Sequence, residues 1–97
     1  MAIAHIKHKG LSKLFVEGDG SKIQPHLVKK ISLLLIVIDT MESIPEDLDR
    51  LQHLDPHKLK GKLSEYWSVS VSGNYRLLFK FDNDTQTASH LDLVDYH

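Results

Sequence analysis

The first half of the chain is predicted to form a short strand followed by two helices, because its apolar residues after residue 9 follow a helical period. Residues 2–7 are rich in side chains that favour strands, so a short first strand is expected there. Residues 10–16 place apolar side chains on one side of a helix, and the glycine-rich stretch 18–21 ends it. A second helix is predicted over 25–41, because Pro25 suits the first turn, where its missing N–H would be unpaired anyway.

The longer predicted helix has one continuous apolar face and further apolar residues on its opposite side. The face comprises Leu27, Ile31, Leu34, Ile38 and Met41. Leu33 and Ile36 fall on the opposite side of the helix. Either the first helix covers these two residues or they contact a partner protein, and we expect the first helix to cover them.

The second half of the chain alternates apolar and polar residues with a period of two. The polar stretch 43–56 precedes it and is interpreted as a loop with one helical turn over 46–51. Over residues 67–72, Trp and Val alternate with Ser, which predicts a half-buried strand whose serines face solvent. Ser72-Gly73-Asn74 then suits a tight hairpin turn, because glycine readily adopts positive φ.

The next predicted strand begins at Tyr75. Its inward face is expected to hold Tyr75, Leu77, Phe79 and Phe81, which leaves Arg76, Leu78 and Lys80 on the other face. Residues 82–84 turn the chain, and residues 86–95 return as a last strand. The sequence therefore predicts an α+β fold, with residues 1–97 as a single domain. An N-terminal strand and two helices come first, and a three-stranded antiparallel meander packs on the helices.

Composition excludes several classes of protein and site. The chain has no cysteine, so disulfides and thiolate zinc sites are impossible. Its longest apolar run covers residues 33–38, far short of the ~20 residues that a membrane-spanning helix needs. The first nine residues have no apolar core of a signal peptide. We therefore expect a cytoplasmic protein that does not enter a membrane.

The overall charge of −1 hides an uneven distribution. Residues 57–81 carry five basic residues and one acidic residue, whereas residues 39–56 carry six acidic residues and one basic residue. A positive segment of this kind can face phosphate while the rest of the surface does not. The alternative is that the alternation of charge only keeps a small domain soluble.

Three side chains in the positive segment are candidates for phosphate chemistry. Arg76 can grip a phosphate through two parallel hydrogen bonds and stabilise charge that develops during its reaction. The neutral imidazole of His57 can take a proton from a hydroxyl, and the ammonium group of Lys60 can offset phosphate charge. The alternative for Arg76 is a structural ion pair with a carboxylate such as Asp92. The alternative for His57 and Lys60 is that they lie in an exposed loop without a function.

The last three residues, Asp95-Tyr96-His97, also have side chains that could take part in phosphate chemistry. In a strand, Asp95 and His97 would share one face, and Tyr96 would point to the other. Asp95 could orient an imidazole, and Tyr96 could stack on a base or bind phosphate. The alternative is a frayed terminus without function. Two histidine pairs, His5-x-x-His8 and His53-x-x-x-His57, also have spacings that can bind zinc, but no cysteine supports a metal site there.

Taken together, these motifs resemble the HigB toxins, the plasmid-maintenance killer branch of the RelE/ParE toxin superfamily. The resemblance spans essentially the whole chain and rests on four segments: His57-x-Leu59-Lys60-Gly61, Tyr66-Trp67-Ser68-Val69-Ser70-Val71, Asn74-Tyr75-Arg76-Leu77-x-Phe79 and Asp95-Tyr96-His97. It implies a RelE-like fold and a ribosome-dependent endoribonuclease that cuts mRNA in the ribosomal A site without a metal or other cofactor. It also implies a HigA-like antitoxin with a helix-turn-helix domain, through which alone the toxin would reach operator DNA.

The resemblance also implies roles for individual residues. His57 and His97 would be the acid and base, in an order that stays open, and Asp95 would support them. Lys60 and Arg76 would stabilise the scissile phosphate, and Tyr96 would contact the nucleotide. Two alternatives remain. ParE-type toxins share this fold and inhibit DNA gyrase by binding alone, and a degenerate toxin would serve only as an antitoxin-binding module.

Overall fold

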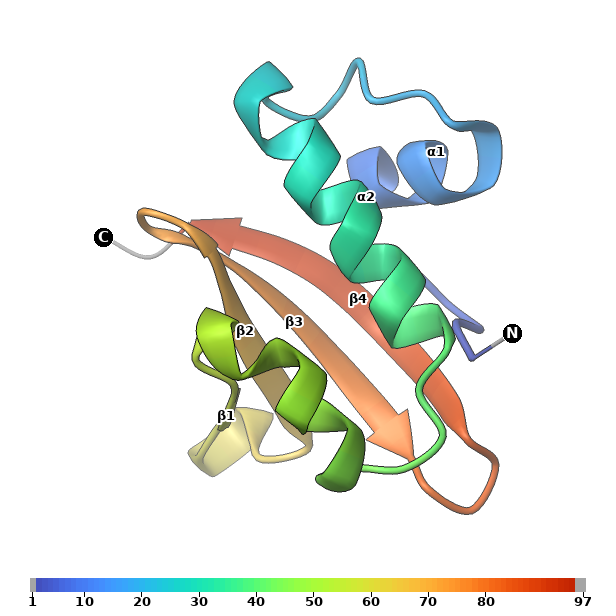
Figure 1. Cartoon of the computed structure of the whole chain (residues 1–97), viewed down its shortest axis with the longest axis vertical. Helices are drawn as coiled ribbons and strands as arrows, with labels where there is room; N and C mark the ends of the chain where they lie inside the picture. The colour runs from blue at the N-terminus through green and yellow to red at the C-terminus, as the bar shows by residue number, and fades with distance from the viewer. Residues whose placement is uncertain (1, 96–97) are drawn as a thin grey trace.

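The computed structural model describes residues 2–95, in which helices pack against one antiparallel sheet (Figure 1). The helical elements are α1 (Lys9–Glu17), α2 (Pro25–Asp39) and two 3₁₀ helices, η1 (Glu46–Leu54) and η2 (Gly61–Leu63). The strands are β1 (His57–Lys58), β2 (Tyr66–Ser72), β3 (Tyr75–Asp82) and β4 (Thr87–Asp95). The predicted α+β fold is confirmed.

Both α-helices begin and end near the predicted positions. The Nδ1 atom of His8 accepts a hydrogen bond from the Leu11 N–H and caps α1, and Gly18 ends that helix with φ +73°. Pro25 opens α2 as expected, although α2 stops at Asp39, two residues before the predicted end. The predicted inner face of α2 is buried throughout, which confirms the helical period.

The expected cover over Leu33 and Ile36 is wrong. Each of these side chains is 58% exposed. The reason is the place where α1 meets α2: a shallow pocket lined by Leu14, Phe15, Ser32, Leu35 and Ile36 marks that junction. The first helix therefore covers the flank of α2 that carries Leu35, and the outermost strip of α2 stays in solvent.

The sheet has the order β1-β2-β3-β4 within residues 2–95, with every neighbour antiparallel. The predicted meander corresponds to β2, β3 and β4, and β1 is an additional short strand that the sequence did not reveal. The N-terminal segment lies extended beside β4, but it forms only two isolated parallel bridges, from Ile3 to Ala88 and from Ile6 to Leu91. It is therefore a sheet-edge segment rather than a continuous first strand.

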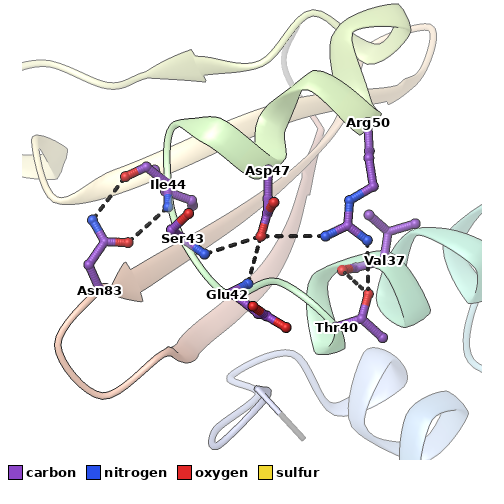
Figure 2. Close-up of polar contacts among 8 residues, drawn as sticks. All are labelled: Val37, Thr40, Glu42, Ser43, Ile44, Asp47, Arg50 and Asn83. Atoms are coloured by element: carbon purple, nitrogen blue, oxygen red, sulfur yellow. Dashed lines mark hydrogen bonds and ion pairs between the residues drawn. The ribbon is translucent and has the colours of Figure 1, made fainter.

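The polar stretch before β1 is more ordered than predicted, because η1 extends from Glu46 to Leu54. One carboxylate oxygen of Asp47 accepts hydrogen bonds from the N–H groups of Glu42 (2.7 Å) and Ser43 (3.1 Å) and pairs with Arg50 at 3.4 Å (Figure 2). The two backbone hydrogen bonds lower the pKa of Asp47, and the charge of Arg50 adds to the effect. The Asp47 carboxylate thus stabilises the bend between α2 and η1.

Asn83 ties the same bend to the β3–β4 turn. Its Oδ1 atom accepts from the Ile44 N–H at 2.8 Å, and its Nδ2 atom donates to the Ile44 carbonyl at 2.9 Å (Figure 2). The side chain of Ile44 is buried, as are the three leucines of η1, Leu48, Leu51 and Leu54. These residues bring η1 against the sheet face that carries Leu77 and Phe79, both fully buried.

Candidate functional site

The start of β3, the end of β4 and the segment after η1 lie at one corner of the molecule (Figure 1). In the β3–β4 register, Tyr75 lies opposite Asp95, and Arg76 lies opposite Val94. The guanidinium of Arg76 reaches the backbone of Asp55, immediately after η1. Residues from three separate parts of the sequence therefore meet here.

Two hydrogen bonds hold the Arg76 side chain. Its Nε atom donates to the Ser68 Oγ at 2.6 Å, and its Nη2 atom donates to the Asp55 carbonyl at 3.3 Å. A guanidinium has five N–H groups, so this arrangement leaves others for a ligand. The side chain is partly exposed, as a phosphate-binding group must be.

The expectation that Ser68 faces solvent is wrong, because Ser68 is fully buried. Serine 68 lies between β1 and β3, opposite His57 on one side and Leu78 on the other, and its hydroxyl faces Arg76. The predicted alternative partner of Arg76, Asp92, lies opposite Leu78 and forms its ion pair with Lys7 at 3.8 Å. The structure thus favours an arginine held by a hydroxyl and a carbonyl over an arginine neutralised by a carboxylate.

His57 lies beside this arginine because β1 pairs with β2. Its Nε2 atom is 3.1 Å from the Oδ2 atom of Asp55, and both side chains are largely exposed. Asp55 closes η1 in the left-handed conformation, with φ +53°. The same residue thus contacts Arg76 through its carbonyl and His57 through its carboxylate.

Lys60 lies at the start of η2, three residues after His57, and is exposed. Two other lysines on the sheet lie over aromatic rings. The Nζ atom of Lys58 is 5.3 Å from the ring centre of Trp67, and the Nζ atom of Lys80 is 5.1 Å from the ring centre of Tyr66. Lys60 remains outside the hydrogen-bonded group formed by Arg76, Ser68, Asp55 and His57 within the described residues.

The predicted terminal group is only partly placed. Asp95 ends β4 opposite Tyr75, next to the position that faces Arg76. Tyr96 and His97 lie outside the described residues, so their grouping with His57 stays a prediction. The hydroxyl of Tyr75 accepts a hydrogen bond from the Gln24 side chain, which joins this corner to the start of α2.

Both histidines of the first pair with zinc-like spacing, and His57 of the second, have other contacts. His8 caps α1, and the ring of His5 packs edge-on against His90 at 5.0 Å. No group of three or more possible ligands that could hold a metal ion is found among residues 2–95.

Sequence reasoning missed Asp55 and Ser68. Ser68 stood in a regular alternation that predicted exposure, but it is fully buried, with β1 paired beside it and the Arg76 side chain bonded to its hydroxyl. Asp55 is brought to Arg76 and His57 by the turn at the end of η1, for which the sequence carried no clear signal beyond the following proline. Together the group offers a held cation, an imidazole and a carboxylate on a partly exposed surface, a set suited to binding and reacting a phosphate.

A family model described as the RelE-like toxin of type II toxin-antitoxin system HigB matches residues 4–97. The chain belongs to this family. Membership of a type II toxin-antitoxin family implies an antitoxin partner, and it confirms the resemblance inferred from the motifs. This HigB-like chain is also 39% identical over 95 residues to the Endoribonuclease HigB of Proteus vulgaris, a match that covers 98% of this chain and 99% of that protein.

Within residues 2–95, no helix is long and apolar enough to cross a bilayer.

Proposed function

We propose that this HigB-like toxin is a ribosome-dependent endoribonuclease that cleaves mRNA in the ribosomal A site. The observation that carries the proposal is the partly exposed Arg76, held by Ser68 and Asp55 beside the imidazole of His57. The name of the Proteus vulgaris relative, an endoribonuclease, supports the same activity for a chain that aligns over nearly its full length.

The proposed reaction uses the nucleophile that RNA itself supplies. One histidine, His57 or His97, removes the proton of a 2′-hydroxyl, whose oxygen forms a bond to the adjacent phosphorus. The P–O5′ bond breaks, and the other histidine donates a proton to the leaving 5′-oxygen. The products are a 2′,3′-cyclic phosphate, which hydrolysis can open to a 3′-phosphate, and a 5′-hydroxyl. Proton transfer contributes about 10²–10⁴-fold to such a rate.

Arg76 and Lys60 stabilise the charge that develops on the phosphate in this scheme. Such a preorganised donor is worth about 10²–10³-fold, and it acts best when the ribosome positions the mRNA. Asp95 supports the acid and base, and Tyr96 contacts the nucleotide. No metal or other cofactor takes part, so cleavage should persist in EDTA, and loss of activity in EDTA would refute this scheme.

We propose a HigA-like helix-turn-helix antitoxin as the protein partner, with operator DNA bound only through that antitoxin. The ribosome and its mRNA are the proposed targets, which places the action in the cytoplasm and away from any membrane. The exposed Leu33 and Ile36 on α2 are apolar residues that such a partner would cover.

The test is a map of mRNA 5′ ends after brief induction of the wild type, Arg76→Ala and Arg50→Ala. Arg50 is the other arginine of the chain, and it pairs with Asp47 away from the site, so it serves as the matched control. We expect new ends within translated codons for the wild type and Arg50→Ala, and none for Arg76→Ala. Growth arrest without new ends would indicate a gyrase-type binding toxin instead. Normal growth without cleavage would leave an antitoxin-binding module.

A further inference from the structure

Asp55 contacts both of the side chains on which the proposed reaction depends. Its carbonyl accepts from the Nη2 atom of Arg76 at 3.3 Å, and its Oδ2 atom lies 3.1 Å from the Nε2 atom of His57. Within residues 2–95, Ser68 also contacts Arg76 and lies opposite His57 in the β1–β2 pairing, which places the backbone of His57, whereas Asp55 bonds to the imidazole itself. The orientation of the imidazole next to the guanidinium therefore depends on the side chain of Asp55, whose backbone also holds Arg76.

The backbone of Asp55 makes this double contact possible. A residue in the left-handed conformation turns its carbonyl and its side chain in directions that a helix would not allow, and Asp55 has φ +53° at the end of η1. Asp and Asn are the non-glycine residues that tolerate this conformation best. Aspartate at this position thus combines a suitable backbone with a carboxylate that reaches His57.

The carboxylate also determines which nitrogen of a neutral His57 carries the proton. An ionised carboxylate only accepts hydrogen bonds, so a neutral imidazole that bonds to it must donate from the facing nitrogen. That nitrogen is Nε2, and the lone pair then lies on Nδ1. A histidine whose base nitrogen is set by a carboxylate on its other nitrogen is a known catalytic arrangement.

We propose that Asp55 is a positioning residue that holds the neutral imidazole of His57 in the Nε2–H form, so that Nδ1 exchanges the proton with the RNA. The catalytic part of this inference rests on the proposed nuclease function, whereas the tautomer does not. Both side chains are mostly exposed, 59% for His57 and 71% for Asp55, so the pair contributes little to stability. The effect of Asp55 is instead to orient the imidazole of His57.

The first test is the ¹⁵N spectrum of the imidazole of His57 in the neutral form, which distinguishes the two tautomers. We expect the Nε2–H form to predominate in the wild type and to lose its excess in Asp55→Gly. Glycine keeps the left-handed backbone and the carbonyl that Arg76 uses, and it removes only the side chain. The matched control is Gln86→Gly, because Gln86 is exposed and also left-handed, with φ +55°, in the turn between β3 and β4.

A wild type with the Nδ1–H form, or an unchanged tautomer ratio in Asp55→Gly, would overturn the inference. This measurement needs no RNA, so it decides the geometric part whatever the proposed function turns out to be.

The second test is the rate of mRNA cleavage on programmed ribosomes. We expect Asp55→Gly to lower kcat by about tenfold or more with KM nearly unchanged, since misorientation of a reacting group slows the reaction step and leaves binding intact. Gln86→Gly should match the wild type. Full kcat in Asp55→Gly, with cleavage still lost in Arg76→Ala, would overturn the positioning role and leave the proposed function standing. If the wild type does not cleave at all, the catalytic role falls with the proposed function.

Discussion

Replacement of Asn83 by alanine should weaken the fold by separating the β3–β4 turn from the bend before η1. The side-chain amide of Asn83 makes two hydrogen bonds to the backbone of Ile44, at 2.8 and 2.9 Å, and both are partly buried (Figure 2). Ile44 is 39 residues away in sequence, so the contact closes a long stretch of chain. Alanine removes both the acceptor for the Ile44 N–H and the donor to the Ile44 carbonyl.

The magnitude follows from the two bonds that are lost. A typical hydrogen bond contributes about 0.5–1.5 kcal/mol net, so the pair is worth about 1–3 kcal/mol. Asn83 itself is exposed, which lets water reach part of the freed backbone, and we therefore expect the lower half of that range. A loss of ~1 kcal/mol lowers the Tm of a domain of this size by about 4–8 °C.

The assay is urea unfolding of the wild type, Asn83→Ala and a control, Asp84→Ala, from the same turn. The Asp84 side chain is exposed, and the hydrogen bond of this residue to Asp82 uses its backbone N–H, so removal of the side chain should change the free energy of unfolding by less than about 0.5 kcal/mol. The m-value should stay constant across the series. A change below about 0.5 kcal/mol in Asn83→Ala, equal to that of the control, would refute the reasoning.

Three further predictions concern stability. Hydrogen bonds from the backbone of Glu42 and Ser43 lower the pKa of Asp47 in the folded protein. The carboxylate therefore stabilises the fold at pH values above its pKa in the unfolded chain, and this stabilisation is lost as the pH falls through its lower pKa in the folded protein. Asp47→Asn should therefore be less stable than the wild type at pH 7, with the gap closing below about pH 4; a constant gap would contradict this. Partial desolvation and then nearby positive charges lower the pKa of His90, so the wild type should lose stability as pH falls below about 6.5, and His90→Gln should lose less. Phe79→Ala should cost about 3–5 kcal/mol in urea unfolding, because the ring is fully buried; a loss below about 2 kcal/mol would show that the core collapses around the gap.

The helices and the central hairpin could be predicted because their signals are local. The 3.6-residue period placed the inner face of α2, and the alternation from Trp67 onward placed β2 and β3. Arg76 was selected as a candidate for the same reason, since its place on the strand follows from the turn at Gly73. These features depend on residues that are close in sequence, and little tertiary information is needed to find them.

The sequence could not show which residues surround those candidates. Leu33 and Ile36 are apolar residues of the kind that is usually buried, but α1 packs on a different flank of α2 and leaves them in solvent. A serine in an alternating strand is normally exposed, whereas Ser68 is buried, with the short strand β1 paired beside it and the Arg76 side chain bonded to its hydroxyl. Such outcomes depend on the packing of distant segments.

The fold class, the family and the side chains available for phosphate chemistry can all be inferred from the sequence alone. Those properties are carried by short motifs and by periodicity, and both survive in a linear string of residues. The tertiary structure decided that Arg76 is held by Ser68 and Asp55, and that Asp55 also reaches His57. The Asp55–His57 contact is local in sequence and the Ser68–Arg76 contact crosses the β2–β3 hairpin, but the contact between Arg76 and Asp55 joins segments 21 residues apart. Their relative position is set only when η1 packs on the sheet, because a hydrogen bond requires its two atoms to lie within about 3 Å of one another.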